Sequence, residues 1–417
     1  MIPLSILVLL SAFFSLSTIA LLQRKEYRLD RLLVYFSEAF EWSDFFFRRP
    51  LWTLKTILFF TLTLIIVMAT GLSFAGVTKP MLLLISLGLA CFLVLGQSLI
   101  KRISIFLAMV KRNQQSSLLV IGVTGSYGKT GIKEMIATVL SEKLNVLKTP
   151  GHVNTDFGIA QVLLRHLRPE HEVCVVEMGA YKKGEIASIC RMVVPNIGVL
   201  TGINEQHLAL FGSMENTMEA KGELRDALPL DGVLFFNADD ERVTHIAERF
   251  TGKKIGFSGK NENQEAVVAV ATHLGLSKAE IKRGVEKRPK ELIEKKKGVN
   301  GATFLDDSYS SNPTGFSFAL DVLAGQKGRK IIVTPGIIEL GPARERVHRE
   351  LGEKITTIGA LLIVTHSSFA DLFGADRWCQ FTDDQSILKF LSQNLTKEDT
   401  VLIEGRISVY LKKGLGL

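Results

Sequence analysis

The stretch that most constrains the fold runs from Val120 to Thr130 and reads Val-Ile-Gly-Val-Thr-Gly-Ser-Tyr-Gly-Lys-Thr. An apolar strand leads into a glycine-rich turn, and the following segment, Ile132–Leu140, has the apolar periodicity of a helix. A strand, a glycine turn and a helix in this order aim backbone N–H groups and a helix N-terminus at an anion. The sequence therefore predicts an α/β fold with a phosphate-binding loop after an early strand.

This loop predicts a nucleoside triphosphate such as ATP as the ligand. Lys129 would reach the outer phosphates, and the Thr130 hydroxyl is available to Mg²⁺. Val123 stands where the general pattern has glycine, so the match is to the shorter form Gly-x-x-Gly-Lys-Thr. The alternative is a strand–turn–helix with incidental glycines. The predicted nucleotide-binding residues here are Gly125, Ser126, Tyr127, Gly128, Lys129 and Thr130.

Apolar residues dominate the first hundred or so residues. Three hydrophobic segments, Ile2–Leu22, Leu54–Phe74 and Met81–Ile100, are each about 20 residues long, the length that crosses a bilayer. The alternatives are a signal peptide for the first segment and buried core helices for the other two. We predict a membrane region over residues 1–111 with three transmembrane helices.

The placement of Lys and Arg predicts the topology. Basic residues gather between the first and second segments and again after the third, whereas the connection between the second and third carries only Lys79. This pattern predicts a multi-pass membrane protein whose catalytic region lies in the cytoplasm, with membrane lipid as a partner. The net charge of +8 requires no nucleic acid. The basic run from Lys287 to Lys297 is expected to be a solvated surface, with a second lipid contact as the alternative.

From Leu118 onward, apolar strand-like runs alternate with helical stretches, the pattern of parallel sheets covered by helices. We predict a central ATP-binding domain over 112–297 and a C-terminal, Rossmann-like α/β domain over 298–417. Helices are expected at Phe157–His166, Met214–Ala227 and Gln385–Gln393. The expected strands are Leu118–Val123, Val173–Glu177, Ile197–Thr201, Gly232–Asn237, Ala302–Asp306, Lys330–Thr334, Ala360–Thr365 and Thr400–Glu404.

Several polar clusters accompany these elements. Glu177 ends a buried strand, at the edge where open α/β sheets place their ligands. The other clusters contain Asn154-Thr155, His207-Leu208, Ala220-Lys221-Gly222-Glu223, Asn237-Ala238-Asp239-Asp240, Asp306-Asp307-Ser308-Tyr309 with Asn312-Pro313, and Glu339-Leu340-Gly341.

Together with the loop, these motifs resemble the Mur ligase superfamily, the ATP-dependent amide-forming enzymes of peptidoglycan synthesis, and especially its MurF type, which adds D-alanyl-D-alanine. The resemblance covers roughly residues 118 to 410. It implies a P-loop central domain with a parallel-rich sheet and a C-terminal domain that closes over the nucleotide. It also implies a reaction in which ATP phosphorylates a carboxylate and an amine attacks the resulting acyl phosphate.

The resemblance further assigns roles to residues. Lys129, His207 and Lys221 would be catalytic, and Thr130 and Glu177 would hold one Mg²⁺. His207 and Lys221, the latter as a carbamylated lysine, would hold a second Mg²⁺. Residues assigned to the nucleotide are Asn237, Asp307 and Asn312, and those assigned to substrate are Asn154 and Thr155.

Plainer alternatives exist for several of these residues. Lys221 could be a surface lysine, although no acid lies three or four residues away on its helix. His207 could be a core or capping histidine, Glu177 a structural carboxylate, and Asn237 a turn residue.

We therefore predict an ATP- and Mg²⁺-dependent peptide ligase of cell-wall precursor synthesis. Its substrates would be a muramoyl-peptide-like acceptor and an amino acid or dipeptide donor. Because apolar segments stand where the family has its UDP-sugar domain, a lipid-linked or other non-UDP acceptor is an alternative. The others are a ligase that forms a different amide, such as a polyglutamyl product, and a nucleotide-binding membrane scaffold.

Overall fold

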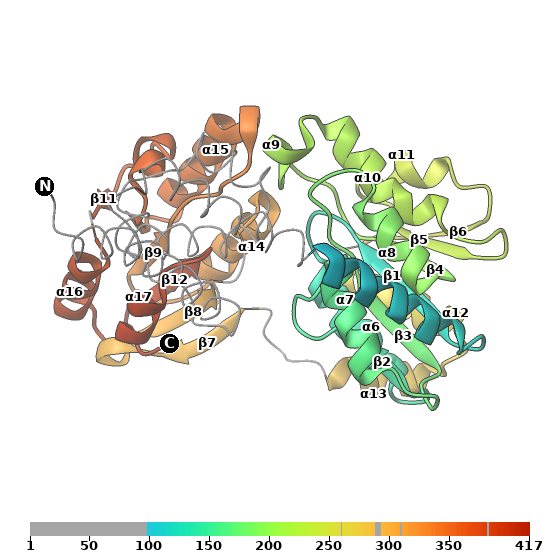
Figure 1. Cartoon of the computed structure of the whole chain (residues 1–417). Coiled ribbons are helices and arrows are strands. Elements are labelled where there is room, and N and C mark those ends of the chain that lie inside the picture. Colours follow the sequence, from blue (N-terminus) through green and yellow to red (C-terminus); the bar gives the residue numbers. More distant parts are fainter. Residues whose placement is uncertain (1–97, 260, 288–292, 309–310, 382) are drawn as a thin grey trace, which may run out of the picture. The chain divides into compact units, whose positions relative to one another are not determined.

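The computed structural model describes residues 98–259, 261–287, 293–308, 311–381 and 383–417. The predicted apolar segments lie outside the described residues, apart from residues 98–100. One compact unit, Ser104–Leu417, contains two six-stranded sheets. A helix over residues 98–113 precedes the first sheet (Figure 1).

All strand pairs of the first sheet are parallel, in the order β2-β3-β1-β4-β5-β6. The glycine loop follows β1, a central strand, and Glu177 ends its neighbour β3. Their carboxyl ends therefore meet at one edge of the sheet. The strands are β1 (Leu119–Thr124), β2 (Val146–Lys148), β3 (Val173–Glu177), β4 (Ile197–Leu200), β5 (Val233–Asn237) and β6 (Lys253–Phe257).

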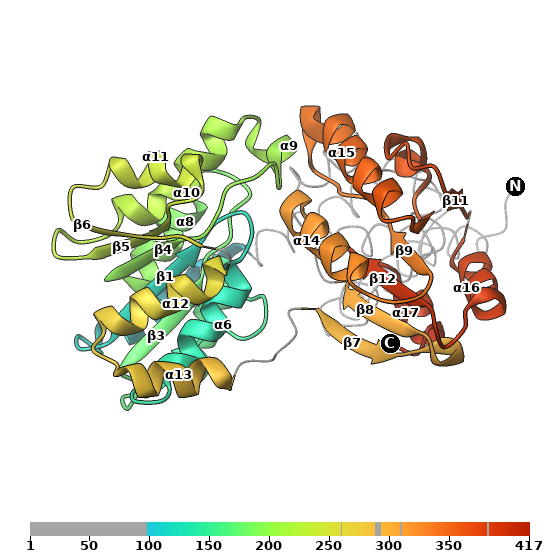
Figure 2. The same ribbon diagram turned by 180° about the vertical axis from the view of Figure 1, so that it is seen from behind.

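Helices cover both faces of this sheet because its strands are apolar on both sides. One face carries α6 (Lys129–Leu140), α12 (Glu262–His273) and α13 (Lys278–Glu286), seen in front in Figure 2. The other face packs against the helix over 98–113 and four more helices. These are α7 (Asp156–His166), α8 (Glu185–Val193), α10 (Met214–Asp226) and α11 (Glu241–Glu248), while the short α9 spans Leu208–Phe211.

The second sheet has the order β11-β10-β9-β12-β8-β7 and is parallel except for the antiparallel edge strand β7. Helices α14 and α15 lie on one side and α16 and α17 on the other (Figures 1 and 2). The strands are β7 (Glu294–Lys297), β8 (Thr303–Asp307), β9 (Lys330–Thr334), β10 (Leu361–Val364), β11 (Trp378–Gln380) and β12 (Thr400–Glu404). The helices are α14 (Pro313–Ala324), α15 (Arg344–Thr357), α16 (Asp384–Asn394) and α17 (Val409–Gly414), with 3₁₀ turns at Val299–Gly301, Gly341–Ala343 and Ser367–Leu372.

The predicted α/β architecture with parallel-rich sheets is confirmed. All eight predicted strands form, and their observed bounds differ from the predicted ones by at most one residue at each end. The predicted helices also form, as α6, α7, α10 and α16. The sequence did not predict β2, β6, β7 and β11, which are the edge strands of the two sheets.

The prediction of a multi-pass membrane location is wrong for the part of the chain that the structure describes, and nothing in that part supports membrane lipid as a partner. The three predicted transmembrane helices lie outside the described residues, apart from residues 98–100. None of the described helices is long and apolar enough to cross a bilayer. The described helix over 98–113 carries Lys101, Arg102, Lys111 and Arg112. Two of these cations hold the helix to the first sheet's domain: Lys111 Nζ donates to Leu164 O, and Arg112 Nε donates to Val193 O, both at 2.8 Å.

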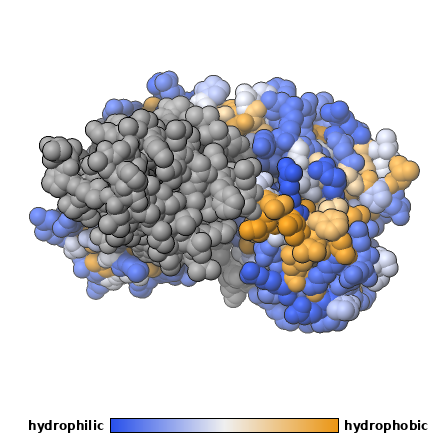
Figure 3. All heavy atoms as spheres, in the orientation of Figure 1, coloured by the Kyte–Doolittle hydropathy of each residue, from blue (hydrophilic) through white to orange (hydrophobic). Residues whose placement is uncertain are grey.

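The same helix has an exposed apolar stripe. Its members repeat at helical spacing, and each is 41–62 % exposed. Figure 3 shows apolar surface on this face of the molecule. The stripe consists of Leu99, Ile100, Ile103, Phe106, Leu107 and Val110.

Candidate active site

The loop between β1 and α6 has the geometry that its glycines predict. Gly128 caps α6 with a left-handed backbone (φ 76°), which glycine adopts without strain. A Cβ at Gly125 would collide with Thr201 Oγ1 at the end of β4. The loop is further tied to this neighbouring segment by two hydrogen bonds, from Ser126 N to Gly202 O (2.6 Å) and from Thr201 Oγ1 to Tyr127 O. The chain between β1 and α6 is therefore held in a tight turn at the helix N-terminus.

Lys129 lies across this loop. Its Nζ donates to Gly125 O and Ser126 O, both at 2.8 Å. Burial lowers the pKa of Lys129 to about 8, although the negative charge of Glu177 opposes the shift. A buried ammonium group is poorly solvated and is therefore stabilised by a neighbouring anion. This agrees with the prediction that Lys129 binds the outer phosphates.

Thr130 and Glu177 come together beside the loop, as their predicted shared metal site requires, and Asn154 joins them. Thr130 Oγ1 donates to Glu177 Oε2 at 2.9 Å, and Asn154 Nδ2 donates to Glu177 Oε1 at 3.0 Å. The Glu177 side chain is only 1 % exposed. A buried carboxylate next to a hydroxyl at the start of α6 supplies hard oxygen ligands.

These oxygens fit a Mg²⁺ that is bound together with phosphates. No group of three or more His, Cys, Asp or Glu side chains suited to a metal occurs among the described residues. Mg²⁺ is commonly held by one or two carboxylates plus substrate phosphates, rather than by a cage of protein ligands. The donor set at Thr130 and Glu177 is of that kind.

Thr155 has a local role. It is the N-cap of α7, and its Oγ1 accepts a hydrogen bond from Gly158 N at 3.3 Å. Its neighbour Asn154 donates to the Glu177 carboxylate, as described above. Thus only Asn154 of this predicted substrate pair lies directly against Glu177.

His207 pairs with an acid. Its Nδ1 donates to Glu339 Oε2 at 2.6 Å, and its ring lies edge-on to Tyr181 at 4.6 Å. Both His207 (φ 62°) and Glu339 (φ 67°) have a left-handed backbone, which is uncommon for non-glycine residues and concentrates at functional sites. A neutral imidazole that donates from Nδ1 has its lone pair on Nε2, the form that can ligate a metal.

Lys221 is buried on α10 rather than exposed. The residue is 3 % exposed, and its Nζ lies 5.7 Å from the ring centre of Phe211. Within the described part of the chain, its ammonium group forms no hydrogen bond or salt bridge. Burial, and then the nearby charge of Lys129, lower the pKa of Lys221 to about 7. The surface-lysine alternative is therefore wrong.

Asn237 ends β5 with a buried, unsatisfied donor. Its Oδ1 accepts from Asp239 N at 3.0 Å, while its buried Nδ2 has no hydrogen-bond partner. A buried polar group without a partner is rare and calls for an explanation. A ligand with an acceptor atom, such as a nucleotide base, would satisfy it.

Asp307 and Asn312 lie at the carboxyl edge of the second sheet. Asp307 is the register partner of Glu404 on the neighbouring strand β12. Burial raises the pKa of Asp307 to about 6, and burial together with Asp307 raises that of Glu404 well above its usual value. Asn312 caps α14: its Oδ1 accepts from Gly315 N and from Asn204 Nδ2, both at 3.0 Å.

The sequence prediction missed two residues beside Glu177. His152 Nδ1 lies 3.1 Å from Thr130 Oγ1, and the fully buried Lys133 lies 3.5 Å from Glu177 Oε2. Lys133 follows Thr130 by three positions, so the two side chains share one face of α6. That spacing was a signal that could have identified it.

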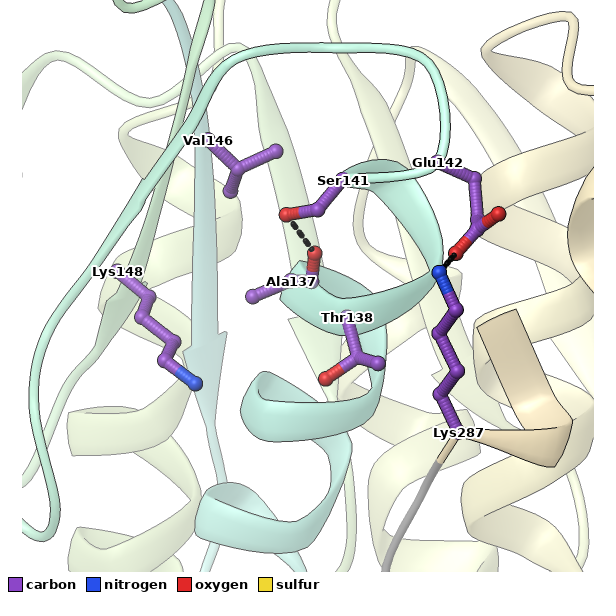
Figure 4. Close-up of a pocket in the computed structure, with 7 residues that line it drawn as sticks. All are labelled: Ala137, Thr138, Ser141, Glu142, Val146, Lys148 and Lys287. Atoms are coloured by element: carbon purple, nitrogen blue, oxygen red, sulfur yellow. Dashed lines mark hydrogen bonds and ion pairs between the residues drawn. The ribbon is translucent and has the colours of Figure 1, made fainter. Parts of the chain in front are cut away.

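The hollow drawn in Figure 4 is remote from these groups. It lies at the C-terminal end of α6, the opposite end from Lys129, where Glu142 pairs with Lys287 at 2.5 Å. It contributes nothing to the candidate active site.

Two family models match nearly all of the region with the sheets. The Mur ligase middle domain matches residues 123–291, and the Mur ligase, glutamate ligase domain matches residues 291–407. The first contains the phosphate loop, Glu177, His207 and Lys221, and the second contains Asp307 and Asn312.

Curated relatives agree with these matches. UDP-N-acetylmuramoyl-tripeptide–D-alanyl-D-alanine ligase of Synechocystis sp. is 29 % identical over 72 % of this chain and 74 % of its own length. The enzyme of the same name from Bacillus subtilis is 28 % identical over 72 % of this chain and 76 % of its own length.

A solved structure of MurF from Acinetobacter baumannii has a TM-score of 0.68 and 26 % identity, covering 75 % of this chain and 79 % of that one. The MurF ligase of Thermotoga maritima, solved in complex with ADP, has a TM-score of 0.66 at 24 % identity and covers 75 % of this chain and 82 % of that one. The phosphate loop with its buried acid, the two matched models and these relatives lead to one conclusion: the chain belongs to the Mur ligase family.

Proposed function

We propose that this chain is an ATP-dependent peptide ligase of peptidoglycan synthesis that adds D-alanyl-D-alanine to a UDP-linked muramoyl-tripeptide. The observation that carries the proposal is the hydrogen bond from Thr130 to the buried Glu177 beside the phosphate loop. The proposed substrates rest on relatives named UDP-N-acetylmuramoyl-tripeptide–D-alanyl-D-alanine ligase, which this chain matches over about three quarters of their own length.

The reaction has two balanced steps. A carboxylate oxygen of the acceptor attacks the γ-phosphorus of ATP, the bond to the bridging oxygen breaks, and ADP leaves with the electron pair. The amine nitrogen of the donor then attacks the carbonyl carbon of the acyl phosphate. Phosphate leaves with the C–O electron pair, and the amine loses one proton.

The protein's task in these steps is positioning and charge stabilisation. Lys129 and the N–H groups at the start of α6 would hold the outer phosphates, and the Asn237 amide would bind the adenine. Thr130 and Glu177 would hold Mg²⁺, which neutralises phosphate charge when bound. His207 and a carbamylated Lys221 would hold a second metal ion. Asp307 and Asn312 would bind the nucleotide from the second sheet, and Asn154 and Thr155 would bind the substrate.

The buried amine of Lys221 supports the carbamate. An amine reacts with CO₂ only in its neutral form, and a pKa near 7 keeps a large neutral fraction at neutral pH. The product is an anion with carboxylate-type oxygens, whereas the ammonium group would repel a metal ion.

The test is ADP release by the purified full-length protein with Mg-ATP, UDP-muramoyl-tripeptide and D-alanyl-D-alanine, with each component omitted in turn. We expect release only when all are present. Lys129→Ala should lower the rate roughly 100-fold or more, because charge stabilisation at the phosphates is lost. The exposed Lys278→Ala serves as a matched control and should keep the rate.

ADP release that ignores the UDP-linked acceptor would contradict the proposed substrate. Release with another carboxylate acceptor, such as a lipid-linked muramoyl-peptide, would support the alternative ligase. Tight ATP binding without turnover on any acceptor would support a nucleotide-binding scaffold.

A further inference from the structure

Lys133 is a fully buried lysine in the candidate active site. It lies on α6 one turn after Lys129, has 0 % exposure, and is among the largest fully buried side chains of the described residues. Its Nζ donates to Gly151 O and lies 3.0 Å from Glu134 Oε1 and 3.5 Å from Glu177 Oε2. A buried ammonium group requires partners of this kind, because an unpaired one would be strongly destabilising.

The geometry makes Lys133 the charge partner of Glu177. The other polar contacts of that carboxylate come from neutral donors, the Asn154 amide and the Thr130 hydroxyl. Lys133 is the cation that forms a salt bridge with Glu177 among the described residues. The buried carboxylate therefore has beside it a fixed cation of the same helix that carries Thr130, and it shares this cation with Glu134.

This balance bears on metal binding. A free divalent cation at Thr130 and Glu177 would meet one carboxylate whose charge Lys133 already offsets in part, and it would be repelled by the same ammonium group. At short range in a site shielded from water, such repulsion is large. Triphosphate oxygens at the loop would add several negative charges and reverse that balance.

We propose that Lys133 is a positioning residue that makes metal binding at Thr130 and Glu177 conditional on the nucleotide. Mg²⁺ alone is not held, and the ion joins the site together with the phosphates. Lys133 also fixes the segment that carries His152 and Asn154, through its hydrogen bond to Gly151 O. This inference rests on the metal site in the proposed function, but not on the identity of the acceptor or the amine.

The test measures binding of Mn²⁺, as a paramagnetic substitute for Mg²⁺, to the full-length protein with and without a non-hydrolysable ATP analogue. We expect the unmodified protein to bind Mn²⁺ only weakly alone and much more tightly with the analogue. Lys133→Met keeps most of the length of the unbranched side chain and removes the charge, so Mn²⁺ alone should bind at least roughly tenfold more tightly. Lys133→Arg should behave like the unmodified protein.

A matched control separates this effect from a general loss of positive charge. Lys148 also pairs with Glu134, but it is half-exposed and makes no contact with Glu177. Lys148→Met should leave Mn²⁺ binding without nucleotide unchanged. In Lys133→Met combined with Glu177→Gln, the gained Mn²⁺ binding should disappear.

Two results would overturn the proposal. One is a folded Lys133→Met protein with no gain in Mn²⁺ binding. The other needs no variant of Lys133: the unmodified protein binds Mn²⁺ alone as tightly as with the analogue, and Glu177→Gln removes that binding. Nucleotide-dependent Mn²⁺ binding in a protein that releases no ADP with the peptidoglycan substrates would support the inference while the proposed reaction fails.

Discussion

Lys221 gives a prediction at the scale of a single residue. Its pKa of about 7 means that the amine is mostly protonated below that pH and mostly neutral above it. Carbamate formation, and ligase activity with it, should therefore rise as the pH increases through about 7. Carbon-13 NMR with labelled bicarbonate should show a carbamate signal in the full-length protein that Lys221→Ala lacks.

In the proposed function a carbamylated Lys221 would hold a metal ion near the transferred phosphate, so Lys221→Ala should lower ADP release roughly 100-fold or more. A small carboxylate added to the buffer should restore part of the rate, since it can occupy the space of the carbamate. Full activity of the unmodified protein in CO₂-free buffer would argue against the carbamate.

At this scale, a contact could be predicted where the sheet brings the ends of two neighbouring strands together. The meeting of Thr130 with Glu177 follows from two adjacent parallel strands whose carboxyl ends share an edge. The partner of His207 could not be predicted in this way, because Glu339 is 132 positions away. The burial of Lys133 was also missed, because a charged residue on a helix is usually solvated.

At the scale of the element, the helix-capping role of Thr155 can be distinguished by experiment from its predicted role in binding substrate. As the N-cap of α7, it satisfies the Gly158 N–H. Thr155→Ala should lower the free energy of unfolding by about 1 kcal/mol, whereas Thr155→Ser keeps the cap and should change it little. Chemical denaturation of both variants checks this.

If Thr155 also contacts substrate, Thr155→Ser should raise KM for the acceptor without a loss of stability. An unchanged denaturation midpoint for Thr155→Ala would contradict the capping role.

The strands show which elements a sequence can predict. Central strands are buried on both faces and read as continuous apolar runs, so all eight of them were identified. The edge strands are short or charged: β2 has three residues, and β7 reads Glu-Lys-Lys-Lys. Neighbouring strands, rather than their own apolar pattern, determine that they pair.

At the scale of the whole molecule, Arg112 connects the helix over 98–113 to the first sheet. The residue is 7 % exposed, and its guanidinium group donates to Val193 O (2.8 Å) and to Leu118 O (3.4 Å). Arg112→Ala in the full-length protein should lower the free energy of unfolding by about 2–3 kcal/mol, because buried carbonyl groups lose charged donors. Thermal denaturation checks this, with the exposed Arg102→Ala as a control that should change little.

If Arg112→Ala unfolds at the same temperature as Arg102→Ala, the helix is not held through this guanidinium group. At this scale the sequence predicts membrane spans from the apolar runs before residue 100, and these runs lie outside the described residues apart from residues 98–100. Apolar residues of the described helix after residue 97 instead form a stripe next to cations that bond to the domain's backbone.

The charged edge strands affect how copies of this protein behave in a crowded solution. A sheet edge offers unpaired backbone groups to which a strand of another chain can add. β6 begins with the exposed Lys253 and Lys254, and β7 carries Lys295 and Lys297 on its exposed surface. Like charges would face each other if two such edges approached, so these lysines oppose edge-to-edge aggregation through β6 and β7.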